Sequence, residues 1–170
     1  MKYSKAQIFY HWVSVMLLII MTLSGLAYTY DWLGKGVINL HQIVGQLFIA
    51  LLAIRLFARL KRRATSTPPA QSGIQAAMAR IVHVGFYGCL IAYVATGYVS
   101  ASGLGDPALL APLNQAFARS DLGEQILETH FMLKWVLLGL LTLHIAAVLK
   151  HQFWDKDGTL ANMTFATRKP

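Results

Sequence analysis

Four long apolar stretches constrain this chain more than any other feature of its 170 residues. They run over about 8–30, 38–60, 80–101 and 125–151, and each is long enough to cross a bilayer as a helix. Charged residues make up only 13% of the chain, about half of the share that is usual in soluble domains. We therefore expect an all-α integral membrane protein: a four-helix up-down-up-down bundle that forms one domain over 1–170.

Basic residues predict how this bundle lies in the membrane. The net charge is +8. Most lysines and arginines fall near the N-terminus, after the second stretch and in the C-terminal tail: Lys2, Lys5, Arg59, Lys61, Arg62, Arg63, Arg80, Lys150, Lys156, Arg168 and Lys169. The positive-inside rule then places both termini in the cytoplasm. The net charge is thus a sign of topology, and no nucleic acid is expected as a partner. A signal peptide is the alternative interpretation of the first stretch, but the run is long and carries His11 and Trp12 at its start.

Capping and loop signals mark the ends of the stretches. Ser4 with Gln7 and Asp121 with Glu124 have the spacing of capping boxes, which predicts starts for the first and fourth helices. The glycines and prolines of 102–120 predict an extramembrane loop, whose apolar residues Leu109 and Leu110 would lie on the membrane surface. No internal repeat is evident.

Histidines are the candidate functional residues, because ionisable side chains inside a membrane are costly. The chain has six of them: His11, His41, His83, His130, His144 and His151. Fourteen residues separate His130 from His144, which is roughly 21 Å along a helix and returns to nearly the same side of it. Predicted depth in the membrane pairs His11 with His144 near the cytoplasm and His41 with His130 near the outer side.

Two imidazoles that face each other across a bundle suit the two axial positions of a haem iron. We expect His11 and His144 to hold an inner haem iron, and His41 and His130 to hold an outer one. With both axial positions filled by protein, such a centre transfers electrons. The alternatives are histidines that only hydrogen-bond between helices, or a zinc site. Zinc prefers a tetrahedral cluster of ligands, and no suitable set of Cys or carboxylate residues lies nearby.

Further polar residues surround the predicted centres. Arg55 lies fourteen residues after His41, so it shares that helix face and suits a haem propionate, as Arg59 does one turn further out. The alternative for both is a cation that snorkels to the membrane surface. His83 and His151 would orient a ligand, hold a propionate, or face a quinone headgroup as donors of a hydrogen bond and a proton; ordinary interfacial histidines are the alternative. For Lys134 three roles stay open: it would snorkel to the membrane surface, bind a propionate of the outer haem, or attract an anionic electron donor.

These residues resemble the bacterial cytochrome b561 family over nearly the whole chain. The matching segments are Tyr3–Ser4, Ile8–Phe9–Tyr10–His11–Trp12, Leu40–His41 with Gly45, Arg55 with Arg59, His83 with Tyr87, Thr129–His130, and Leu149–Lys150–His151 with Asp155–Lys156–Asp157–Gly158–Thr159–Leu160 and Met163. The resemblance implies a four-helix protein of the bacterial inner membrane with two b-type haems. The family's ligand positions match His11, His41, His130 and His144.

The resemblance also implies electron exchange with ubiquinone. In one branch of the family the electrons come from periplasmic superoxide, whereas other members look like cytochrome subunits of hydrogenases or dehydrogenases. Three hypotheses follow. The chain is a superoxide-oxidising quinone reductase that works alone, a relay subunit docked to a periplasmic redox partner, or a non-redox transporter that uses its histidines as a proton relay.

Overall fold

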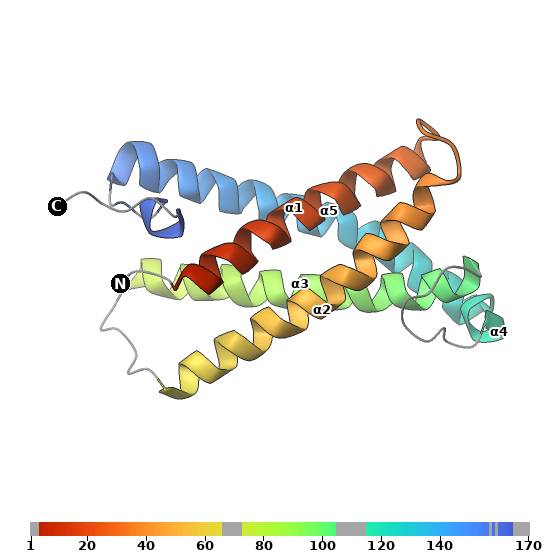
Figure 1. Cartoon of the computed structure of the whole chain (residues 1–170), viewed down its shortest axis with the longest axis horizontal. Coiled ribbons are helices and arrows are strands. Elements are labelled where there is room, and N and C mark those ends of the chain that lie inside the picture. The colour runs from red at the N-terminus through yellow and green to blue at the C-terminus, as the bar shows by residue number, and fades with distance from the viewer. Residues whose placement is uncertain (1–3, 66–72, 105–114, 157, 159, 165–170) are drawn as a thin grey trace.

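Four long helices make up most of the protein in the computed structural model (Figure 1), which describes residues 4–65, 73–104, 115–156, 158 and 160–164. These helices are α1 (Lys5–Thr29), α2 (Val37–Thr65), α3 (Ile74–Leu104) and α5 (Asp121–Lys150). The short helix α4 (Gln115–Ala118) precedes α5. A π-helical turn, η1 (His151–Asp155), and a 3-10 turn, η2 (Ala161–Met163), follow it. All four long helices are long and apolar enough to cross a membrane. The expected all-α membrane fold is therefore confirmed.

The helix starts show how local sequence sets the boundaries. At the start of α1 the predicted capping box is present: Gln7 N donates to Ser4 Oγ over 3.2 Å, and Ser4 N donates to Gln7 Oε1 over 3.1 Å. At α5 the predicted cap was wrong by one residue. Ser120 is the N-cap, with its Oγ accepting from Gly123 N over 3.4 Å. Asp121 and Glu124 instead lie in the first turn, where acidic side chains favour the positive end of the helix dipole.

The helices associate as two hairpins. α1 lies along α2 and α3 lies along α5, whereas the contact between the two hairpins is sparser and runs mainly through α2 and α3 (Figure 1). A small buried core of Met21, Val44, Phe48 and Leu52 joins α1 to α2. Tyr87, Leu90 and Val94 of α3 pack against this core. The second hairpin is thereby held against the first along one side.

The two ends of the bundle differ. We call the end with the turn over 30–36 the outer end and the opposite end the inner end, after the predicted orientation. In this turn, which joins α1 to α2, Asp31 and Gly34 adopt φ of 53° and 71°. α4 lies at the same end (Figure 1). At the inner end, Trp12 Nε1 of α1 donates to the carbonyl of Met163 in η2 over 2.8 Å. The start of α1 and η2 thus lie together, which fits the predicted even number of crossings. Which end faces the cytoplasm stays a prediction.

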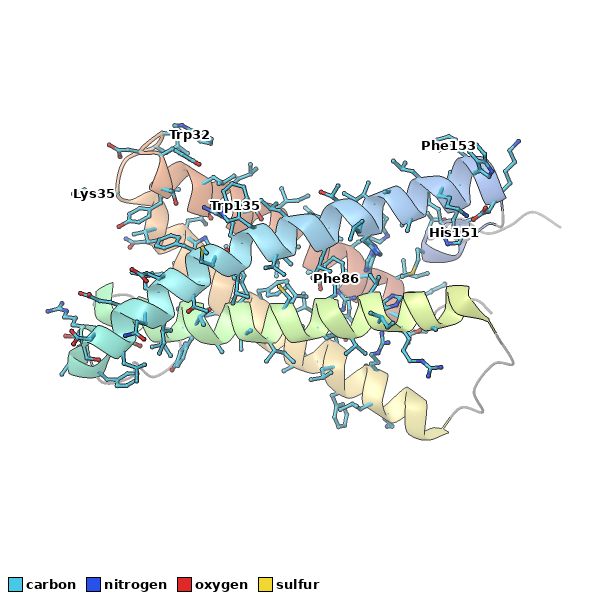
Figure 2. All side chains as sticks on the ribbon, turned by 180° about the vertical axis from the view of Figure 1, so that it is seen from behind. Trp32, Lys35, Phe86, Trp135, His151 and Phe153 are labelled. Carbon is cyan, nitrogen blue, oxygen red and sulfur yellow. The ribbon has the colours of Figure 1, made fainter. Side chains whose placement is uncertain are left out.

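Exposed aromatic side chains mark both ends (Figure 2). Trp32 lies at the outer end close to Lys35, and Phe153 and His151 lie at the inner end. Trp32 is 63% exposed and Trp154 85% exposed, as expected for side chains that sit at the membrane–water interface. Leu109 and Leu110, predicted to lie on the membrane surface, are outside the described residues.

Candidate functional site

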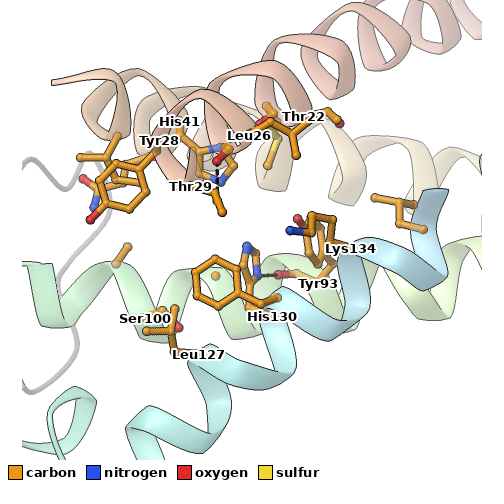
Figure 3. A pocket seen from close by; sticks show the side chains of 18 of the residues that line it. Thr22, Leu26, Tyr28, Thr29, His41, Tyr93, Ser100, Leu127, His130 and Lys134 are labelled. Carbon is orange, nitrogen blue, oxygen red and sulfur yellow. Dashed lines mark hydrogen bonds between the residues drawn. The ribbon is translucent and has the colours of Figure 1, made fainter. Parts of the chain in front are cut away.

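His41 of α2 and His130 of α5 face each other across the two hairpins (Figure 3). Their ring centres are 6.4 Å apart and their planes are nearly perpendicular, at 86°. His130 is buried and His41 is half-buried. The structure therefore brings together the outer pair that the sequence predicted from depth alone.

Each of these rings is tied to a backbone carbonyl of its own hairpin. Nδ1 of His41 donates to the carbonyl of Met21 over 2.9 Å, and Nδ1 of His130 donates to the carbonyl of Tyr93 over 3.0 Å. A carbonyl oxygen only accepts, so Nδ1 carries the proton of the neutral ring and Nε2 keeps its lone pair. Metal-binding histidines are held in this way in other proteins, with the second ring nitrogen bonded to a carbonyl or carboxylate.

The same local pattern holds both rings. Ser24 Oγ lies 3.2 Å from His41 Nδ1, and Thr96 Oγ1 lies 3.2 Å from His130 Nδ1. A glycine follows each hydroxyl residue, and a Cβ added at Gly25 or Gly97 would lie 3.1 or 2.8 Å from Cε1 of the neighbouring histidine. This repeat was not predicted from the sequence, although the segments 21–25 (MTLSG) and 93–97 (YVATG) share the hydroxyl–glycine pair at the same spacing.

A cavity of about 390 Å³ lies between the two rings, within the range of small-molecule sites. If one metal ion bound a nitrogen of each ring over about 2 Å, the distance from each nitrogen to its own ring centre would be added on both sides. The two ring centres would then lie roughly 6 Å apart. The measured 6.4 Å therefore fits one metal ion between the rings. Among the described residues there is no group of three or more His, Cys, Asp or Glu able to hold a metal. Two facing imidazoles suit a haem iron, whose other four bonds come from the macrocycle, better than zinc.

Charged side chains also line the same cavity. Arg119, Glu124 and Lys134 are all among its lining residues. The Lys134 ammonium lies 5.0 Å from the Trp135 ring centre and 5.8 Å from that of Phe131. Lys134 therefore belongs to the wall of the outer site, one turn of α5 inward from His130.

The second predicted pair lies towards the inner end. His144 of α5 is near enough to His11 of α1 for the two rings to interact electrostatically. Nη2 of Arg55 lies 3.5 Å from Nδ1 of His11. The Phe86 ring contacts His144 edge-on, with ring centres 5.6 Å apart, and His83 interacts electrostatically with His144. Arg55 thus lies beside His11 and His83 near His144, and their roles towards a cofactor stay predictions.

The other two candidates have different contacts. The guanidinium of Arg59 lies over the Tyr87 ring, 5.1 Å from its centre, at the contact of α2 with α3. His151 Nδ1 lies 3.1 Å from Asp155 Oδ2 in η1, and Lys150 Nζ lies 2.6 Å from the same oxygen. Both residues remain at the inner end, and whether they contact a cofactor stays a prediction.

Fold and site together define a class of protein: multi-pass helical membrane proteins that pair histidines across two hairpins. The family described as prokaryotic cytochrome b561 has a sequence model that matches residues 2–166, and the chain belongs to this family. The cytochrome b561 homolog 2 of Escherichia coli (strain K12) is 30% identical to it over 166 residues, which cover 91% of this chain and 86% of that relative. No solved structure matches the chain.

The resemblance noted from the sequence is therefore confirmed. Membership makes the chain a multi-pass bacterial membrane protein of a cytochrome b family, and haem b binding and electron transfer are consistent with it.

Proposed function

We propose that this protein is a di-haem b electron carrier of the bacterial inner membrane that exchanges electrons with quinone. The observation that carries the proposal is the pair of His41 and His130, with ring centres 6.4 Å apart and each Nδ1 bonded to a carbonyl. These two residues would hold the outer iron, and His11 and His144 the inner iron. Bound haem supplies a one-electron Fe(III)/Fe(II) couple.

The protein's contribution is rigid ligation. Both axial positions of each iron would be taken by imidazoles, which excludes oxygen or substrate from the metal. The bonds to Met21 and Tyr93 hold the outer imidazoles in one tautomer. The spacing of His130 and His144 along α5 would place the two sites roughly 20 Å apart. The two sites therefore form a path from one membrane face towards the other.

Quinone exchange is proposed at the inner end. Reduction of a quinone to quinol takes two electrons and two protons, so the site needs proton donors and a hydrogen bond to each carbonyl. His83 and His151 are the candidates, because imidazole donates a proton near neutral pH. His83 lies near His144, and His151 lies on Asp155. This end is the cytoplasmic one in the proposed orientation of both termini.

Periplasmic superoxide is the proposed donor at the outer end. Arg119 and Lys134 line the outer cavity itself, so an anion that enters it meets positive charge. Each superoxide loses one electron and leaves as dioxygen, and two such events reduce one quinone to quinol with two protons. The alternative, a relay subunit docked to a periplasmic redox partner, is supported by the acidic residues at this end. Asp121, Glu124 and Glu128 are among them, and they suit a basic protein partner.

The first test is a haem count on the purified protein by pyridine haemochrome. We expect two b-type haems per chain, one after His130→Ala and one after His144→Ala. The matched control is His151→Ala, which should keep both. Absence of haem from the unaltered protein would overturn the proposal and favour a histidine relay in a transporter.

A second assay separates the two electron donors. Superoxide should reduce quinone in the presence of the purified protein alone. A protein that binds two haems but shows no such activity would instead be a relay that needs a periplasmic partner.

A further inference from the structure

We propose that Ser24–Gly25 and Thr96–Gly97 are two matching clamps that hold the planes of His41 and His130 perpendicular across the outer haem. Their residues position the ligands and do not themselves bind iron. The inference rests on the proposed function, in which these two histidines are the axial ligands. It goes beyond that function by assigning the orientation of each ring to a short segment of the neighbouring helix.

The hydroxyl groups form the same network in both clamps. Ser24 Oγ donates to the carbonyl of Ile20 over 2.7 Å, and Thr96 Oγ1 donates to the carbonyl of Ala92 over 2.8 Å. Each hydroxyl hydrogen is therefore committed to its own helix, and the oxygen is left to accept. The Nδ1–H of the histidine is a donor within reach of this oxygen, with Nδ1 3.2 Å away in both cases. Each Nδ1–H thus points between a carbonyl and a hydroxyl oxygen, which fixes the rotation of the ring.

The glycines allow each ring to lie against the backbone of the next helix. A Cβ at Gly97 would lie 2.8 Å from Cε1 and 3.2 Å from Nδ1 of His130, so the ring would have to turn or retreat. A Cβ at Gly25 would lie 3.1 Å from Cε1 of His41, a milder contact. Close approach of this kind needs glycine, because any larger residue fills the space.

The two clamps also differ in what stacks on the histidine ring. The Tyr93 ring stacks on His130, with ring centres 4.1 Å apart and planes only 3° from parallel. The corresponding residue of the first clamp is Met21, which has no flat ring to stack. His130 therefore has less freedom to turn than His41, and a methyl group at Gly97 acts on the tighter clamp.

Ring orientation has a spectroscopic consequence. Perpendicular axial imidazoles leave two d orbitals of ferric iron nearly equal in energy, which gives a highly anisotropic low-spin EPR signal. Parallel rings separate these orbitals and give a rhombic signal. The observed angle of 86° predicts the anisotropic type for the outer haem. Second-shell hydrogen bonds orient metal-bound histidines in general, so the clamp residues should control this signal.

The test compares Gly97→Ala and Gly25→Ala with Gly139→Ala in the full-length, haem-loaded protein. Gly139 is a matched control, because it lies on α5, the helix that carries His130, and a Cβ there meets no atom within 4 Å. We expect one of the two ferric low-spin signals to become more rhombic in Gly97→Ala, to change less in Gly25→Ala, and to stay constant in Gly139→Ala. An unchanged spectrum in Gly97→Ala with two haems bound would overturn the inference, as would an equal change in the control.

Thr96→Val keeps the test decisive if Gly97→Ala loses the outer haem. This substitution nearly preserves side-chain volume and replaces the hydroxyl with a methyl group. We expect the outer EPR signal to shift and haem affinity to fall by roughly 10- to 100-fold, as when other second-shell partners are removed. No shift in Thr96→Val would refute the clamp while leaving two haems per chain, whereas a protein that never binds haem refutes the proposed function instead.

Discussion

Replacing Arg55 by glutamine should lower the reduction potential of the inner haem. Nη2 of Arg55 lies 3.5 Å from Nδ1 of His11, so an iron bound at the far ring nitrogen would be about 8 Å from the positive charge. Two unit charges at that distance interact by about 2 kcal/mol at an effective permittivity of 20. For a one-electron couple this corresponds to about 90 mV. Ferric iron carries one more positive charge than ferrous iron, so Arg55 favours the ferrous form and its removal lowers the potential.

The assay is a redox titration followed by the haem absorption bands, in a His130→Ala background where only the inner haem is expected. Arg55→Lys is one control, because it keeps the charge and should keep most of the potential. Arg59→Gln is another, because the guanidinium of Arg59 is engaged with the Tyr87 ring, and it should shift the potential less. A rise in potential in Arg55→Gln, or a shift no larger than that of Arg59→Gln, would refute the reasoning.

Three further predictions concern the rest of the chain. Trp12→Phe removes the donor to the Met163 carbonyl. We expect the attachment of the C-terminal segment to α1 to weaken by about 1 kcal/mol of free energy, and limited proteolysis to cleave that segment faster. An unchanged cleavage rate would contradict this. Lys134→Gln should slow haem reduction by superoxide and weaken its dependence on ionic strength in stopped-flow measurements, whereas Lys156→Gln at the other end should change neither. Phe48→Ala opens the core between α1, α2 and α3 and should lower the free energy of unfolding in detergent. The loss should be smaller than the roughly 3–5 kcal/mol typical of soluble cores, because lipid is as apolar as the core it replaces. The Tm should fall accordingly, and a Tm equal to that of the unaltered protein would contradict this.

The membrane spans were predictable because their signal is local. The expected stretches of about 8–30, 38–60 and 80–101 correspond to the candidate spans Lys5–Thr29, Val37–Lys61 and Arg80–Ser102. The fourth, expected over 125–151, is longer at both ends and runs over Asp121–Asp155. A helix in lipid must satisfy its own backbone and be apolar along its length, so composition alone reveals it. The N-cap of α5 was wrong by one residue, because Ser120 and Asp121 are both good caps and only backbone geometry distinguishes them.

The histidines were partly predictable. Helix rise and predicted depth paired His41 with His130 correctly in space, since depth in a membrane follows from distance along the chain. The clamps were not found, because a hydroxyl followed by glycine is common where membrane helices pack closely. Their meaning depends on which helix lies opposite, and His41 and His130 are 17 and 34 residues away from Ser24 and Thr96.

By itself, the sequence determined that the chain has four stretches able to cross a membrane, that its basic residues gather in a few segments, and where its histidines fall along those stretches. These properties depend only on apolar length, on charge and on the fixed rise of a helix. Only the tertiary structure decided which backbone carbonyls accept from His41 and His130, and hence which ring nitrogen keeps its lone pair for a metal. It also decided the angle of 86° between the planes of these two rings. Those depend on how far each helix is rotated about its axis against its neighbour, and that rotation is set by the packing of small residues such as Gly25 and Gly97.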